Sequence, residues 1–150
     1  MSDNNNLFDP KKVSIIEFKM VKGQIDTPEE FDASQVQGHH IENSLQLGFN
    51  MQDKLVKTDF FTEIKTESHG QNTKESVGSF HLVFIFHVEN LNELATSGKG
   101  ELIKVQPALG NAISSISYST SRGILLTRLQ GTALQDFILP VIDPNSLLNK

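Results

Sequence analysis

The side chains in this sequence that could bind a metal ion are its histidines, and their spacing keeps them apart. His39 and His40 are adjacent, so on an extended strand they point to opposite faces. His81 and His87 share a face but lie six residues apart, roughly 20 Å along a strand. Neither pair could chelate one ion unaided, and the sequence contains no HExxH and no CxxC motif. We therefore expect no metal site.

One loop has a partial resemblance to a phosphate-binding motif. Ser97-Gly98-Lys99-Gly100 places a lysine after glycine, but a P-loop also needs glycine at position 93 and Ser or Thr after the lysine. Those positions hold Glu93 and Gly100. No GxSxG motif is present, and no pair of carboxylates is arranged for acid–base chemistry. We interpret the segment as a loop tip with a solvated lysine, and we expect neither enzyme activity nor a cofactor.

Composition narrows the class of protein further. The chain has 150 residues, enough for one domain with a core, and it lacks cysteine, which suits a reducing compartment. Its 18 acidic and 13 basic residues give a net charge of −5, which argues against nucleic-acid binding. We see no signal peptide and no apolar run long enough to span a bilayer, so we expect a cytoplasmic protein. Residues 1–10 are interpreted as a flexible leader and residues 11–150 as a single domain.

The elements that must position any site are predominantly strands. Alternating apolar residues predict strands over 12–25, 39–52, from the turn at 53–54 to 67, and 77–89. Short polar loops between them favour an antiparallel sheet. The last strand is apolar on both faces, which is typical of a central or doubly covered strand. Residues 26–38 are expected to be a connection with one turn of helix, and residues 90–106 a mixed connection.

A helix is expected after the strands, beginning near Pro107. Leu109, Ile113 and Ile116 follow helical spacing, and the same segment is rich in serine, a poor helix former. Such a helix needs close packing for its stability. We expect it to end at Ser121-Arg122-Gly123, with Gly123 in the C′ position, before an extended apolar tail that includes residues 139–144. The predicted fold class is α+β: a four-stranded antiparallel sheet, one long helix and an apolar C-terminal tail.

Apolar surface is the positive functional signal in this sequence. Phe60 and Phe61 are adjacent on one strand, so one of them must leave the main core face. Val83 and Ile85 oppose the apolar stripe of the fourth strand, and one helix cannot cover both faces of a sheet. For any one of these residues, ordinary core packing under the 26–38 connection or the tail would explain its apolar character. The whole set favours an interface with another subunit or a partner.

Taken together, these segments resemble the SecB family of export chaperones. The resemblance is carried by Ser121-Arg122-Gly123 at the helix end, the segment Leu139-Pro140-Val141-Ile142-Asp143, and then Leu147-Leu148. The family typically has a Ser-Arg-Gly-like helix end followed by a segment of the type Leu/Ala-Pro-Val-Asn-Phe-Asp-Ala-Leu. The order of elements agrees over nearly the whole chain.

The resemblance implies a homotetramer built as a dimer of dimers, with helices between two sheets, that holds unfolded polypeptides in apolar grooves without ATP. Apolar contacts and some main-chain pairing would hold the client. The residues expected to contact clients are Phe31, Phe60, Phe61, Val83, Ile85, Leu125 and Leu126. Those expected at the oligomer interface are Ala112, Ser115, Ile116 and Ser119.

The sequence also departs from the family pattern. About eight extra residues, 126–133, lie between the expected helix end and the Pro140 segment, the final helix is nearly absent, and the acidic metal-binding tail is missing. In the family that tail and an acidic sheet face engage the SecA motor, so SecA is a doubtful partner. The leading hypothesis is an ATP-independent holdase, with a role in protein export as one form. The alternatives are a dedicated chaperone of a single partner, such as the antitoxin of a toxin–antitoxin system, and a non-chaperone oligomeric scaffold.

Overall fold

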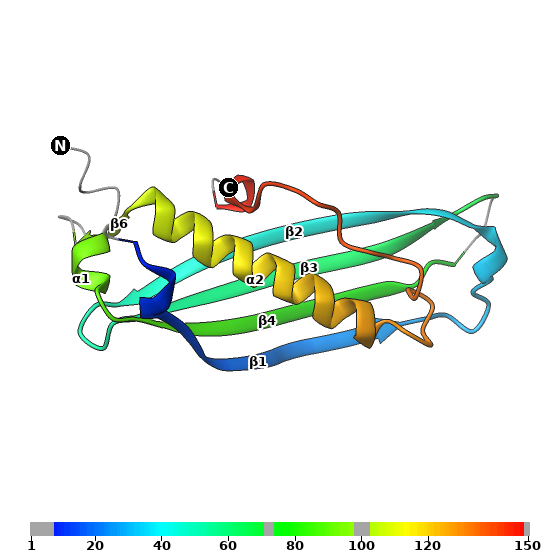
Figure 1. Cartoon of the computed structure of the whole chain (residues 1–150). Helices are drawn as coiled ribbons and strands as arrows, with labels where there is room; N and C mark the ends of the chain where they lie inside the picture. Colours follow the sequence, from blue (N-terminus) through cyan, green and yellow to red (C-terminus); the bar gives the residue numbers. More distant parts are fainter. Residues whose placement is uncertain (1–7, 71–73, 98–102, 149–150) are drawn as a thin grey trace.

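The computed structural model describes residues 8–70, 74–97 and 103–148 and has the predicted α+β architecture (Figure 1). A short helical turn, η2, precedes the first strand, and another, η3, lies in the connection between the first two strands. The elements are η2 (Pro10–Lys12), β1 (Val13–Asp26), η3 (Ala33–Gln35), β2 (Val36–Asn50), β3 (Leu55–Ser68), β4 (Val77–Val88), α1 (Leu91–Leu94), β5 (Ala95–Ser97), β6 (Ile103–Val105), α2 (Pro107–Arg128) and η5 (Pro144–Leu147).

The four long strands form one antiparallel sheet in the order β1-β4-β3-β2. The strand that is apolar on both faces, β4, is an inner strand between β1 and β3, as its sequence predicted. The chain crosses from one edge of the sheet to the other through residues 27–35, so β1 and β2 are the two edge strands. The single helical turn expected in that connection is η3.

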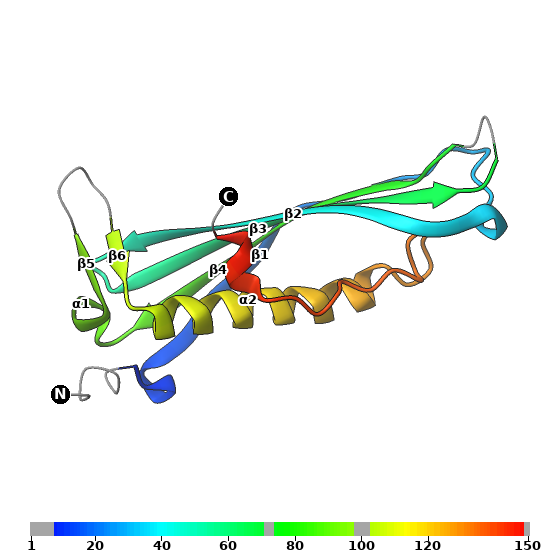
Figure 2. The same ribbon diagram turned by 90° about the horizontal axis from the view of Figure 1, so that it is seen from above.

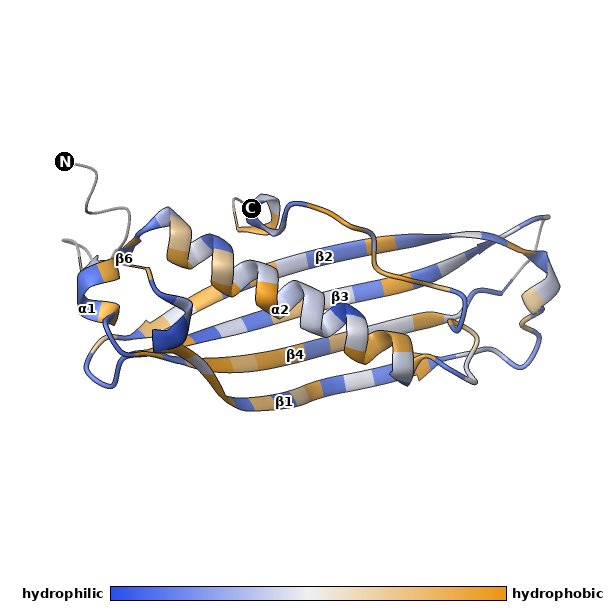
Figure 3. Cartoon of the chain, in the orientation of Figure 1, coloured by the Kyte–Doolittle hydropathy of each residue, from blue (hydrophilic) through white to orange (hydrophobic). Residues whose placement is uncertain are grey.

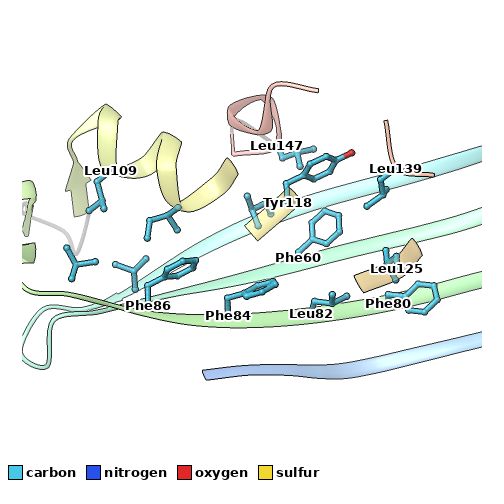
Figure 4. Close-up of a cluster of buried hydrophobic side chains, with 14 of the residues drawn as sticks. Phe60, Phe80, Leu82, Phe84, Phe86, Leu109, Tyr118, Leu125, Leu139 and Leu147 are labelled. Atoms are coloured by element: carbon cyan, nitrogen blue, oxygen red, sulfur yellow. The ribbon is translucent and has the colours of Figure 1, made fainter. Parts of the chain in front are cut away.

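The molecule has two layers, because α2 and the C-terminal segment both lie on one face of the sheet (Figure 2). That face carries the alternating buried residues of β3 and β4, among them Phe60, Leu82 and Phe84, each at most 1% exposed. Figure 4 shows these side chains directed toward Leu109, Tyr118 and Leu125 of the helix. The opposite face is covered by no other element in the described part of the chain.

Polar contacts hold the serine-rich helix close to the sheet. The buried hydroxyls of Ser117 and Thr58 are hydrogen-bonded at 2.9 Å, and Tyr118 meets Phe60 edge-on with ring centroids 5.6 Å apart. Small side chains along this part of α2 permit the approach, since Ser114 and Ser121 are also fully buried. The helix is thus stabilised by close tertiary packing, which offsets the weak helix propensity of serine.

The helix does not end where the sequence predicted. It continues through Gly123 to Arg128, and Gly123 is exposed on its surface. The buried face continues with Leu125 inside the helix and Leu129 at its C-cap, so packing on the sheet outweighs the helix-breaking tendency of one glycine. The chain instead reverses at Gly131, whose φ of +78° lies in the left-handed region that favours glycine. Residues 126–133, expected as an insertion, are the last helical turn and the turns after it.

The connection after β4 is more ordered than expected. It contains the short helix α1 and the hairpin strands β5 and β6, with Leu91 and Leu94 buried in the core. The expected loop tip around Lys99 and positions 1–7 of the expected leader lie outside the described residues. Phe8, near the end of that leader, packs against the core. No helix in the described ranges has both the length and the hydropathy needed to cross a membrane.

Candidate functional site: exposed apolar surfaces

Three of the residues expected to contact clients are core residues. Phe60 is fully buried, and Val83 and Leu125 are each 2% exposed. Phe60 and Leu125 pack between the sheet and α2, and Val83 lies on the opposite face of β4. Side chains packed in this way cannot touch a client while the fold is intact. For Phe60 and Leu125 the apolar stripe that suggested a groove is the core itself, whereas Val83 is buried on the open face of the sheet.

Phe61 and Ile85 lie on the open face of the sheet, and both are half-buried. Phe61 stacks on His81 with ring centroids 4.1 Å apart. His81 Nε2 in turn lies 2.7 Å from Asp59 Oδ1. A shallow hollow of about 610 Å³ surrounds this stack and is lined mainly by residues of the four long strands. The hollow is a mixed polar and aromatic surface at the middle of the open face.

The remaining two expected client residues lie elsewhere. Phe31 is half-buried in the connection between β1 and β2. Leu126 is 39% exposed on the last turns of α2. The structure therefore distributes the expected client residues over the core, the open face, the crossover connection and the helix, and does not bring them together into one groove.

The open face carries charges of both signs. The register of the strands places Glu17, Lys19 and Lys22 of β1 on this face with Lys57, Asp59 and Glu63 of β3. Two ion pairs, the exposed pair Lys19–Glu17 at 3.4 Å and the partly buried pair Lys57–Asp59 at 3.8 Å, link neighbouring charges. The face is consequently a mixed surface and not an acidic patch.

An exposed apolar row on the edge strand β1 was not singled out from the sequence. Ile15, Ile16, Phe18 and Val21 are 47%, 56%, 42% and 56% exposed. The register of β1 on β4 shifts between Ile15 and Glu17 and again between Met20 and Lys22. Each shift inserts an extra residue, so simple alternation does not describe this strand. The available signal in the sequence was a run of large apolar residues at the start of a strand that also carries four charged residues.

Part of this row continues onto the helix. A groove of about 310 Å³ between β1 and α2 is lined by Val13, Ile15, Phe86 and Ile116, with Phe8 and Pro10 at one end. Ile116 is 38% exposed, and the Phe18 ring packs against the Phe84 ring with centroids 5.0 Å apart. We call this the β1–α2 groove. Figure 3 shows apolar residues along β1, β4 and the parts of α2 that face them.

The residues expected at the oligomer interface lie on the solvent side of α2. Ile116 and Ser119 are exposed, and Ala112 and Ser115 are half-buried. Ser114 and Ser117, on the face turned to the sheet, are fully buried. The four expected residues are therefore available to a partner, and Ile116 joins them to the β1–α2 groove.

The C-terminal apolar tail forms a second exposed apolar feature. Residues 137–143, which we call the strap, run in the helix layer on the β2 side of α2 (Figures 1 and 2). Phe137 and Leu139 are buried, whereas Ile138 and Val141 are 60% and 87% exposed. The Tyr118 hydroxyl donates a 2.7 Å hydrogen bond to the carbonyl of Pro140. The strap thus alternates between anchoring and exposed apolar side chains.

A histidine lies under the strap at its first residue. The His39 ring contacts the Phe137 ring with centroids 5.2 Å apart. Partial burial lowers the pKa of His39, and the carboxylates of Asp136 and Glu67 act in the opposite direction. The neutral ring is therefore favoured in the folded state. Within the described ranges, no group of three or more His, Asp or Glu side chains could hold a metal ion.

Comparison with known proteins gives a structural match and no sequence match. No protein-family model matches the chain, and no curated protein is similar in sequence. Among solved structures, the chain resembles a SecB-like chaperone of Mycobacterium tuberculosis determined in complex with a ChAD peptide from the HigA1 antitoxin. The TM-score is 0.61 with 10% sequence identity, and the match covers 88% of this chain and 91% of that chain. At this identity the likeness concerns the fold, and this chain has a SecB-like fold.

Proposed function

We propose that this protein is an ATP-independent holdase that binds non-native polypeptide in the cytoplasm. The observation that carries the proposal is the exposed apolar surface on β1, α2 and the strap, present beside a complete core on the same sheet. Apolar surface of this extent on one small domain usually marks an interaction site. The SecB-like fold supports a polypeptide as the partner.

Simple energetics explain why such a surface would select unfolded chains. Burying about 60 Å² of apolar area contributes about 1.5 kcal/mol, at about 25 cal/mol per Å². Ordering one residue of a disordered client opposes binding by about 1–2 kcal/mol. Only segments rich in large apolar side chains gain enough from burial to offset this term. Folded proteins, which keep those side chains inside, would not bind.

We assign the two exposed apolar features to different partners. The β1–α2 groove, with Ala112, Ser115, Ile116 and Ser119, is assigned to a second copy of this chain, as the helix-sandwiching arrangement of a dimer of dimers requires. The strap, with the half-buried Phe31 and Phe61 as further candidates, is assigned to the client. The buried Phe60, Val83 and Leu125 are not part of the proposed client surface.

A dedicated chaperone of one partner is the second candidate. The structural neighbour is a SecB-like chaperone bound to a peptide from an antitoxin, which favours a single-client role in a fold of this type. The mixed charge of the open face gives no support to docking of the SecA motor through an acidic sheet face. A role in protein export is therefore less supported than a general holdase or a dedicated chaperone.

The test is suppression of aggregation. A chemically unfolded, aggregation-prone protein is diluted into buffer with and without this protein, without nucleotide, and light scattering is followed at several stoichiometries. A general holdase suppresses scattering at about one client per assembled oligomer. A dedicated chaperone leaves scattering unchanged but co-purifies with one native partner. Unchanged scattering together with no co-purifying partner would contradict both proposals and favour a scaffold.

A further inference from the structure

The first residue of the strap lies over a histidine of the sheet. His39 is on the helix-covered face of β2, where the register pairs it with Thr66 of β3. Its ring is half-buried and contacts the Phe137 ring, with centroids 5.2 Å apart. Phe137 itself is 8% exposed, so this contact closes the junction between the strap and the sheet on the β2 side. We call it the His39–Phe137 latch.

The segment around the latch is anchored on both sides of Phe137. Leu134 before it and Leu139 after it are each at most 3% exposed. Among residues 135–138, only Phe137 is buried. Its amide donates a 3.0 Å hydrogen bond to the Leu134 carbonyl. The latch therefore determines whether this short stretch stays closed, while the two leucines keep its ends in place.

The charged groups around the His39 ring belong to three segments. Partial burial lowers the pKa of His39, and the carboxylates of Asp136, beside the strap, and Glu67, on β3, oppose this shift. Both carboxylates are exposed, so water and salt screen their attraction for an imidazolium ion. The third carboxylate, Glu75 in the connection before β4, is already bonded, because the Thr66 hydroxyl donates to it at 2.7 Å. Burial of the ring is thus the stronger influence.

From these contacts we infer that protonation of His39 opens the Phe137 end of the strap in mildly acidic solution. An imidazolium ion is far more costly to remove from water than a neutral ring, so charging His39 disfavours its place under a buried phenylalanine. The closed latch is fully stable above the ordinary histidine pKa of about 6.5 and loses stability as the pH falls below it.

Opening of the latch enlarges the apolar surface of the strap. Phe137 becomes exposed next to Ile138, which is already 60% exposed. A second large apolar side chain beside the first increases the area that a partner can bury. The latch is a property of the fold, whereas its effect on clients rests on the proposed holdase function, to which it adds control by pH.

The first test follows the Phe137 amide in the full-length protein. Hydrogen exchange is measured residue by residue at pH 7.5 and pH 5.5 and expressed as protection relative to an unstructured chain at the same pH. Protection at Phe137 should fall several-fold at the lower pH, while the amides of β3 keep theirs. Unchanged or greater protection of Phe137 at pH 5.5 would overturn the latch.

Two variants assign the response to one histidine. His39→Gln removes the titrating group and should give equal protection of Phe137 at both pH values. His40→Gln changes the adjacent, exposed histidine, which points to the opposite face of β2, and should respond as the wild-type protein does. An equal fall in protection in His39→Gln would overturn the assignment.

A measurement on the wild-type protein covers the case in which His39→Gln does not fold. The His39 ring is titrated by NMR in the folded protein and in a peptide of residues 36–42. The pKa should be lower in the protein. An equal or higher pKa in the protein would overturn the latch, because the carboxylates would then favour the charged ring under the strap.

The second test measures the consequence for binding. The probe is a short, uncharged, apolar-rich peptide with blocked ends, so that only the protein titrates. The wild-type protein should bind it several-fold more tightly at pH 5.5 than at pH 7.5, and His39→Gln equally at both. Equal affinities of the wild-type protein would overturn the control of binding by pH and leave the holdase proposal standing. If neither this peptide nor an unfolded protein binds at either pH, the proposed function is contradicted, and hydrogen exchange alone decides on the latch.

Discussion

The two edge strands of this sheet are built in different ways. β1 is shifted in register twice, carries three charges between Glu17 and Lys22, and exposes large apolar side chains. β2 is regular over most of its length, nearly uncharged, and exposes few large apolar side chains. The same sheet therefore offers side chains for association at one edge and backbone groups at the other. We expect the first edge to recognise a fixed partner, and main-chain pairing at the second edge, of the kind that the SecB resemblance implies, to accept variable sequences.

The largest expected effect concerns the core behind β1. Phe84 is 1% exposed and packs against Phe18, which is 42% exposed. Replacing Phe84 with Ala should lower the free energy of unfolding by about 3–5 kcal/mol, because it leaves a cavity. Replacing Phe18 with Ala should lower it by about 1 kcal/mol, since half of that side chain is already in water. Chemical denaturation measures the free energy of unfolding of both variants. Equal losses of stability would mean that Phe18 belongs to the core and not to an association surface.

Association through β1 gives the next largest effect. Phe18→Asp places a charge in the proposed contact with a second copy, and loss of a central contact weakens association by about 2 kcal/mol, roughly thirty-fold. Gln37→Asp adds the same charge at an exposed position of β2 and is the matched control. Analytical ultracentrifugation should show dissociation of the first variant only. Dissociation of both variants to the same extent would remove the distinction between the edges.

Removing the hydrogen bond that anchors the strap beside β2 should have a smaller effect on stability. Tyr118→Phe keeps the ring against Phe60 and removes the donor to the Pro140 carbonyl. The free energy of unfolding should fall by about 1 kcal/mol. Hydrogen exchange should become faster in the strap and stay unchanged in β1. An unchanged strap would show that Phe137 and Leu139 hold it without this bond.

Phe61 tests whether the open face between the edges takes part in binding. Phe61→Ser removes the stack on His81 and should weaken binding of an unfolded client a few-fold, as expected for one aromatic contact, while the oligomer stays intact. Lys65→Ser changes an exposed residue of the same strand and is the control. Fluorescence anisotropy measures the affinity of each variant for the client. Equal affinities of Phe61→Ser and the wild-type protein would exclude the open face from client binding.

The smallest expected effect depends on pH. Because burial lowers the pKa of His39 in the folded state, the unfolded chain binds its proton more readily. The stability that His39 contributes is complete above its ordinary pKa of about 6.5 and is lost as the pH falls below it. His39→Gln should reduce the loss of stability between pH 7.5 and 5.5 in thermal denaturation. A larger loss in the variant would mean that Asp136 and Glu67 dominate over burial.

Much of the fold was predictable because it depends on local patterns. Alternating apolar residues located the four strands to within a few residues, and the two apolar faces of 77–88 indicated an inner strand. The helix end was wrong, because the glycine at 123 suggested a stop that contacts of Leu125 and Leu129 override. That error follows from reading a local signal where tertiary packing decides.

The candidate site was less predictable, because exposure depends on neighbours distant in sequence. Phe60 and Phe61 look equivalent in the sequence, yet one is fully buried under Tyr118 and the other stacks on His81 on the open face. The directions of the exposed apolar side chains on β1 depend on two register shifts in its pairing with β4. Neither outcome follows from residue type or spacing alone.

The sequence by itself determined the class of the protein: periodic apolar residues made strands and a helix, and the types and spacing of its polar residues offered no catalytic constellation. Only the tertiary structure decided which apolar residues remain outside. A single helix and the strap cover the part of one face nearest β3, so the apolar side chains of β1 and the backbone edge of β2 are left without a partner within the described chain. The physical reason is geometric, since strand order and register place each edge, and no local pattern of residues encodes that order.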